Sequence, residues 1–198
     1  MDIIKNNTIG RVAAMLFLCL AGITGAMARQ PFAMKTNLLY DATLTINLGA
    51  ELQVAPKWSV DLSGNLNAWT LSHDRRWKHW MLQPEARYWL CEPIHGHFFA
   101  GHLIGGQFNA GGWPMEKGFF SKMHDYRYQG WGIGAGLGYG YTWVLGRHWN
   151  FEAEIGVGYI YRHYDKYKCA GCGKKVETGK SGHYVGPTKA ALNIVYVF

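Results

Sequence analysis

Apolar residues alternate with small or polar residues through most of this chain. The clearest stretch is residues 130–140, which read GWGIGAGLGYG, with glycine at every even position and an apolar residue at every odd one. Successive side chains of a β-strand point to opposite faces, so one face of this strand is bare and the other carries Trp131, Ile133 and Leu137. Glycine weakens an isolated strand, and the pattern therefore indicates a strand held on both sides by neighbours, as in a narrow closed barrel.

The same two-residue period predicts eight strands. They cover Met34–Thr43, Ile46–Ala55, Lys57–Trp69, Trp77–Cys91, His97–Asn109, Arg127–Leu145, His148–Tyr164 and Tyr184–Phe198. The fifth segment is less regular, because His102 falls among the apolar residues Phe98, Ala100 and Ile104. A bulge at Gly105–Gly106 would restore its phase.

The connections between these segments alternate in length, except that the first outer connection, around Leu44-Thr45, is short as well. Those after the second, fourth and sixth segments are tight turns, whereas those after the third, fifth and seventh are long: Thr70–Arg76, Ala110–Tyr126 and about Asp165–His183. Short periplasmic turns and longer outer loops are the rule for outer-membrane barrels, and an even strand number leaves both termini on the periplasmic side. The predicted fold is all-β, an eight-stranded antiparallel up-and-down transmembrane β-barrel.

Composition agrees with a membrane barrel. Charged residues make up 17% of the 198 residues and aromatic residues 15%, and no apolar run reaches the roughly 18–20 residues of a membrane-spanning helix. Tryptophan and tyrosine gather near strand ends, and the polar faces carry small residues and balanced charges. The alternative is a soluble exported ligand-binding barrel, in which the apolar faces would point inward.

The first 28 residues have the features of a secretory signal peptide. Lys5 and Arg11 precede an apolar run of about a dozen residues from Val12 to Ile23, which is followed by Ala26-Met27-Ala28. We therefore expect cleavage before Arg29 and a barrel domain over 29–198. A buried N-terminal helix is the alternative.

Several stretches together resemble the DUF3575 family of Bacteroidota outer-membrane proteins. They are Lys35–Ala42, Gln83–Pro93, Tyr126–Trp131, Asp165-Lys166-Tyr167 and Gly186–Lys189. The resemblance extends over nearly all of the mature chain and implies a small outer-membrane β-barrel of unknown function. It also suggests an association with fimbriae or other surface proteins, and the terminal Phe198 resembles the signal that the barrel assembly machinery reads.

Charged residues on the polar faces form the first candidate site. An eight-stranded barrel is only wide enough to be filled by side chains, and buried charges require partners, so we expect a lumenal salt-bridge network. Its members are Lys35, Glu51, Asp61, Glu85, Arg87, Glu152, Glu154, Arg162 and Lys189. A carboxylate pair for acid–base catalysis is the alternative. The bare face of the glycine strand either opens a pocket or accommodates Trp77, Trp89, Met81 or Arg87 from other walls.

The second candidate site is Cys169 and Cys172, a C-x-x-C pair in the last outer loop. In an exported loop a local disulfide is the plainest interpretation. One alternative is a zinc site formed by both cysteines with His163 and His183, and another is a redox role. Cys91 lies beside a periplasmic turn, too far away to join them, and is expected to be a free, buried thiol.

The chain shows no established catalytic motif, no phosphate-binding loop and no nucleic-acid recognition motif. We therefore expect a non-enzymatic surface scaffold or binding protein, with no cofactor, in the outer membrane of a Gram-negative bacterium. Its expected partners are outer-membrane lipid and lipopolysaccharide, whose phosphates would attract the basic outer loops. The enzymatic alternative is a lipid or lipopolysaccharide hydrolase, for which Ser72-His73 and Ser121 with His124 are the candidate pairs.

Overall fold

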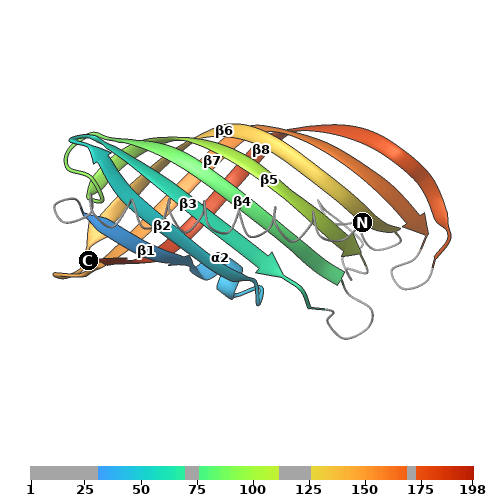
Figure 1. Ribbon diagram of the computed structural model, residues 1–198, viewed down its shortest axis with the longest axis horizontal. Coiled ribbons are helices and arrows are strands. Elements are labelled where there is room, and N and C mark those ends of the chain that lie inside the picture. The colour runs from blue at the N-terminus through green and yellow to red at the C-terminus, as the bar shows by residue number, and fades with distance from the viewer. Residues whose placement is uncertain (1–30, 70–75, 112–125, 169–172) are drawn as a thin grey trace, which may run out of the picture.

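Eight antiparallel strands close into a barrel in which each strand pairs with the next and the last pairs with the first (Figure 1). The computed structural model describes residues 31–69, 76–111, 126–168 and 173–198. The elements are β1 (Phe32–Asn37), α2 (Leu38–Asp41), β2 (Ile46–Ala55), β3 (Trp58–Asn67), β4 (Arg76–Trp89), β5 (Gly96–Gly111), β6 (Tyr126–Val144), β7 (Trp149–Lys168) and β8 (Lys175–Val197). The predicted all-β, eight-stranded, up-and-down order is confirmed, whereas residues 1–28 lie outside the described ranges.

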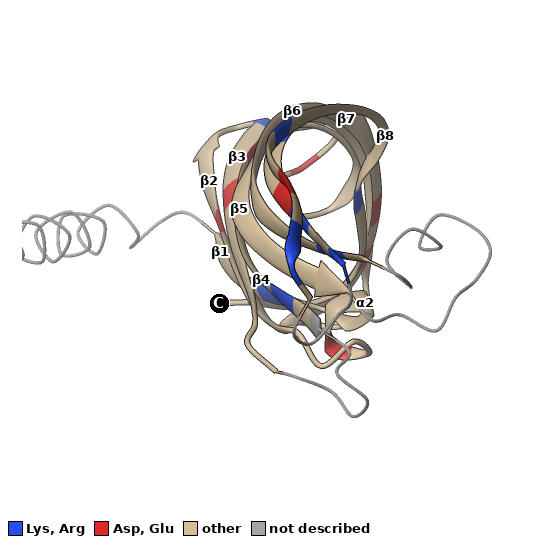
Figure 2. Cartoon of the chain, turned by 90° about the vertical axis from the view of Figure 1, so that its right-hand side faces the viewer, with Lys and Arg blue, Asp and Glu red and all other residues tan. Residues whose placement is uncertain are grey.

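The two ends of the barrel differ. At one end lie the three short turns and the C-terminus, where the Phe198 amide donates a 2.9 Å hydrogen bond to the Phe32 carbonyl. At the other end β6, β7 and β8 continue well past β1–β3, by roughly ten residues or about 30 Å along a strand. Figure 2 views the molecule from this end and shows the long strands curving into a ring.

The first predicted strand is too long. After Asn37 the chain turns into the short helix α2, whose first turn is capped by the Asn37 side chain accepting from the Leu39 amide at 3.1 Å. Asparagine is a preferred N-cap, and this local hydrogen bond outweighs the strand alternation that continues through Leu38, Tyr40 and Ala42.

The last predicted loop is too long as well. β7 extends to Lys168 and β8 begins at Lys175, so most of the Asp165–His183 segment is paired strand. Register shifts near Tyr164, Lys166 and Tyr167 move side chains from one face to the other. These irregularities interrupt the two-residue alternation, so the pattern in the sequence does not reveal that the strands continue here.

The predicted bulge at Gly105–Gly106 is wrong. The pairing of β5 with β4 and with β6 keeps one register throughout the strand. Phe98, Ala100, His102 and Ile104 are all buried on a single face that points into the barrel. β5 therefore contributes apolar side chains, as well as a histidine, to the interior.

Burial is inverted relative to a water-soluble protein. The buried residues of the described chain include more polar and charged side chains than apolar ones, and the glycine face of β6 is turned inward. Large apolar side chains point outward instead: Leu137 is 73% exposed and Ile155 is 63% exposed, whereas Arg87 and Glu152 are 0% exposed. Within the described ranges, no helix has the length and apolarity needed to cross a membrane.

Outward aromatic side chains form two rows around the barrel. Register pairs join Trp58, Tyr88, Phe99 and Tyr139 into a row toward the short-turn end. Trp80, Trp131 and Tyr161 form a second row toward the projecting end, with the last two rings 5.8 Å apart. The surface between the rows carries aliphatic residues such as Leu103, Leu137 and Val157.

Candidate functional site

The Arg87 side chain is the centre of a charge network inside the barrel. It extends from β4 and contacts four carboxylates from three strands. Nη1 lies 2.9 Å from Glu51 and 2.7 Å from Glu152, Nη2 lies 2.8 Å from Glu154, and Nε donates to Glu85. Every one of these side chains is 0% exposed, so each charge depends on protein partners alone.

Two lysines complete the network on either side of the arginine. Lys35 on β1 donates to Glu51 and lies 3.1 Å from Asp61 and 3.6 Å from Glu152. Lys189 on β8 pairs with Glu85 and lies 3.1 Å from Glu154. The structure thus brings together eight of the nine residues expected in the lumen: Lys35, Glu51, Asp61, Glu85, Arg87, Glu152, Glu154 and Lys189.

Arg162 is the exception. It lies on β7 eight residues beyond Glu154, opposite Gly132 and Gly182, and its side chain is exposed beside the Tyr164 ring. The prediction placed it correctly on the polar face of its strand. It was wrong about the network, because β7 continues into the projecting end, and eight strand residues span roughly 26 Å.

Neutral side chains satisfy much of the remaining hydrogen-bonding capacity. Trp89 donates to Ser59 at 2.7 Å, and Ser59 in turn donates to Glu51. Asn193 donates to Glu152 at 2.7 Å. Buried charges held by this many donors form a rigid plug rather than an aqueous channel.

The bare glycine face makes room for side chains from β5. A methyl group added at Gly140 would clash with the Phe98 ring, and one added at Gly136 would lie 2.6 Å from His102 Nε2. Phe98 in turn packs on Trp89 and beneath the Arg87 guanidinium, 4.4 Å from the ring centroid. The expected accommodation is therefore correct in kind, but its occupants are Phe98 and His102.

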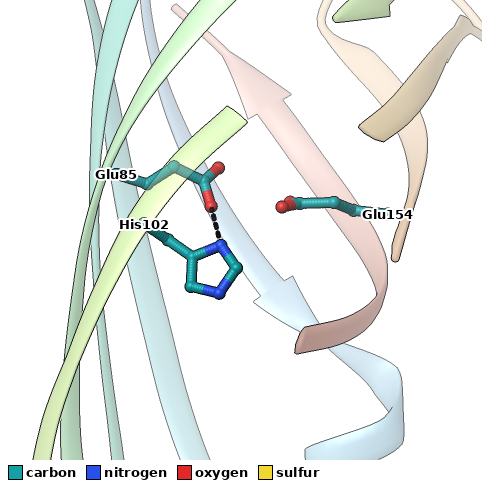
Figure 3. A group of neighbouring side chains, drawn as sticks. All are labelled: Glu85, His102 and Glu154. Carbon is teal, nitrogen blue, oxygen red and sulfur yellow. Dashed lines mark ion pairs between the residues drawn. The ribbon is translucent and has the colours of Figure 1, made fainter. Parts of the chain in front are cut away.

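His102 belongs to the site and was not predicted as a member. Its Nδ1 lies 3.9 Å from Glu85, and Glu154 points toward the pair from the opposite wall (Figure 3). Nε2 lies 2.9 Å from the Thr188 hydroxyl. In the sequence, His102 is a lone histidine on an otherwise apolar strand face. Because that face points into the barrel, the histidine lies beside the buried carboxylates.

A bulge in β8 brings Thr188 to this histidine. Gly156 pairs with Lys189 and Val157 with Pro187, which leaves Thr188 without a partner across the sheet. An extra residue in one strand lets two successive side chains point the same way. Thr188 and Lys189 accordingly both reach into the interior.

Comparison with known proteins places the chain in a family. A family model described as a protein of unknown function, DUF3575, matches residues 14–198. The chain belongs to the DUF3575 family. No curated protein and no solved structure matches it.

The predicted cysteine site of this DUF3575 chain lies outside the described residues. Cys169 and Cys172 fall in 169–172, and the proposed zinc partners lie on the outer surface. The His183 ring accepts or donates a hydrogen bond with the Tyr159 hydroxyl, and His163 contacts Trp131. Cys91 is a free thiol, but it is exposed at the end of β4 rather than buried as expected.

The outer face of β7 and β8 also carries a serine beside a histidine. Ser181 Oγ lies 3.5 Å from His163 Nδ1 and 2.9 Å from the Tyr161 hydroxyl. The nearest acid along the strand, Asp165, instead binds Lys175 at 2.6 Å and the Gly179 amide at 2.9 Å. The earlier hydrolase candidates of the DUF3575 chain, Ser72-His73 and Ser121 with His124, lie outside the described residues.

An open pocket lies where the shorter strands end against the projecting ones. It has a volume of about 630 Å³ and is lined by aromatic side chains, including Trp80, Phe108, Trp131 and Tyr164, together with amides and His79. Aromatic walls with a few polar groups are typical of ligand-binding sites, so this rim is a concave surface suited to binding.

Proposed function

We propose that this DUF3575 chain is an outer-membrane β-barrel with a filled interior, which acts as a non-enzymatic surface scaffold or binding protein. The inversion of burial carries the proposal: charged side chains are buried and aliphatic side chains surround the outside. In water, so large an exposed apolar surface would be unfavourable, whereas in a bilayer it would contact the lipid chains. The two outward aromatic rows correspond to the girdles that flank the apolar band of membrane barrels.

The filled interior argues for a scaffold rather than a pore. Arg87, Lys35 and Lys189 bridge carboxylates from opposite walls, and Phe98 and Trp89 occupy the space beneath the arginine. An eight-stranded barrel has no room for a channel beside such a plug. We expect the inserted protein to conduct no ions.

The projecting part of β6–β8 is the proposed surface-exposed part. Basic side chains gather on it among aromatic rings: Arg127 lies 4.2 Å from the Tyr167 ring centroid and Lys166 lies 3.8 Å from that of Tyr126. We propose that lipopolysaccharide phosphates pair with these cations at the membrane surface. In this proposal both termini are periplasmic, the barrel assembly machinery inserts the chain, and fimbrial or other surface proteins bind its outer end.

Fractionation and gel mobility test the proposal together. Envelopes of cells that produce the chain would be washed with alkaline carbonate, and the retained protein compared on gels before and after boiling. We expect retention in the membrane and a mobility shift on boiling, because closed barrels resist detergent unfolding. Release into the wash with unchanged mobility would favour the soluble exported barrel.

A lipid or lipopolysaccharide hydrolase is the second candidate, and one observation favours it. Ser181 and His163 meet on the outer face of β7 and β8, where a lipid substrate would arrive. Asp165 pairs with Lys175 and does not orient His163, so the serine and histidine lack the acid that would complete a catalytic triad. Fatty-acid release from phospholipid or lipopolysaccharide by the purified chain, lost in Ser181→Ala, would replace the scaffold proposal.

A further inference from the structure

Positive charge is in short supply inside this barrel. Five carboxylates of the network, from Glu51, Asp61, Glu85, Glu152 and Glu154, face three cationic side chains, Lys35, Arg87 and Lys189. With a neutral His102 and all five carboxylates ionised, the network is two positive charges short. Buried charge without compensation is costly, so this cluster favours the binding of a further cation.

Three potential metal ligands of the interior, Glu85, His102 and Glu154, lie close together. One donor atom from each lies within 4.8 Å of the others, and all three residues are buried. Two of these side chains have buried atoms without a hydrogen-bond partner among the described residues: His102 Nδ1 and Glu154 Oε1. The side chains of His102 and Glu154 are both 0% exposed, so bulk water does not satisfy these atoms.

We propose that Glu85, His102 and Glu154 bind a divalent first-row transition-metal ion inside the barrel. Two carboxylates and an imidazole are a donor set suited to Mn²⁺, Fe²⁺ or Zn²⁺. Ligand atoms about 2.1 Å from one ion lie at most about 4.2 Å apart, so the most widely separated of these donor atoms must approach each other by at least about half an ångström when the ion binds. A charge of +2 matches the deficit of the network.

The surroundings of His102 suit a metal ligand. In the tautomer that carries its proton on Nε2, His102 donates to the Thr188 hydroxyl and the Nδ1 lone pair is directed at the carboxylates. Such hydrogen-bond partners commonly orient ligating histidines. The Lys189 ammonium now lies between Glu85 and Glu154, where it would move aside as the ion enters. A small cavity whose lining includes Lys189, Asp61 and Tyr40 lies between the network and the α2 end of the barrel.

Manganese binding to the purified, refolded full chain tests the proposal. Mn²⁺ is the probe because thiolates such as those of Cys169 and Cys172 bind it poorly. After chelator treatment, the bound ion would be counted by electron paramagnetic resonance and elemental analysis. We expect one Mn²⁺ per chain, at least tenfold weaker binding in His102→Gln, and about 10–100-fold weaker binding in Thr188→Val.

His97→Gln is the matched control, since His97 is exposed on the outer face of the same strand and should leave binding unchanged. A mobility shift on boiling confirms that each variant is folded. A folded wild-type chain that binds no Mn²⁺ overturns the proposal, as does a His102→Gln variant that binds it as tightly as wild type. The result is independent of the membrane proposal, because it requires only the folded barrel.

Discussion

At the scale of single residues, Arg87 decides whether the interior can exist. Its guanidinium is the only described group that joins Glu51, Glu85, Glu152 and Glu154 at once. The planar fork of arginine can serve several carboxylates simultaneously, which the compact ammonium of lysine cannot. The network therefore depends on this residue more than on either lysine.

We expect Arg87→Met to destabilise the barrel by at least about 3–5 kcal/mol, the usual cost of leaving buried charges without their partner. Urea unfolding in lipid vesicles, followed by tryptophan fluorescence, measures the effect. Arg162→Met is the control, because Arg162 is exposed and lies outside the network. Similar unfolding midpoints for the two variants would show that the network does not hold the barrel together.

At the scale of elements, the glycine strand β6 fits closely against the side chains of β5. Glycine at Gly140 leaves space that Phe98 fills, and Phe98 supports the Arg87 guanidinium. The bare face is therefore a packing surface for the plug and does not line an open lumen.

Gly140→Ala should destabilise the barrel by about 1–3 kcal/mol, because the added methyl group overpacks against Phe98. Gly101→Ala is matched to it, since Gly101 lies on the outer face of β5 with no atom within 4 Å of the added group. Urea unfolding compares the two variants. A Gly140→Ala barrel as stable as Gly101→Ala would mean that the β6 face is not packed.

The projecting β7–β8 hairpin supplies the element-scale test of anion binding. Lys168 and Lys174 are exposed at its end, and each should contribute about 1 kcal/mol near an anionic surface. The double variant Lys168→Gln/Lys174→Gln should bind lipopolysaccharide vesicles roughly tenfold or more weakly at low salt, with the difference shrinking as salt rises. Lys57→Gln, at the opposite end of the barrel, is the control; equal weakening by both changes would place the binding surface elsewhere.

Much of the barrel follows from its sequence, and the exceptions have identifiable causes. Alternation located all eight strands, and eight of the nine charges that it assigned to inward faces meet in one network. The alternation mispredicted the end of the first strand, because Asn37 caps a helix there. It also missed the continuation of the strands beyond Tyr164, where bulges change the register. His102 was missed because its pairing with Glu85 and Glu154 joins three strands, a contact that depends on ring closure and shear rather than on local pattern.

At the scale of the whole molecule, the two regions of the barrel surface are proposed to meet different environments. The outward aliphatic band between the aromatic rows is proposed to contact lipid, and the projecting strands to stand in water. The two regions share β-structure and differ in position along the barrel axis. Their solvent environments should therefore differ sharply within one molecule.

Collision of a nitroxide label with oxygen and with a water-soluble nickel chelate measures this environment directly. Single cysteines would replace Leu137, in the middle of β6, and Val176, at the start of β8, in a chain with Cys91, Cys169 and Cys172 changed to serine and reconstituted into vesicles. We expect the label at 137 to meet oxygen far more often than the chelate, and the label at 176 to show the reverse. A label at 137 that is as accessible to the chelate as the label at 176 would contradict this expectation.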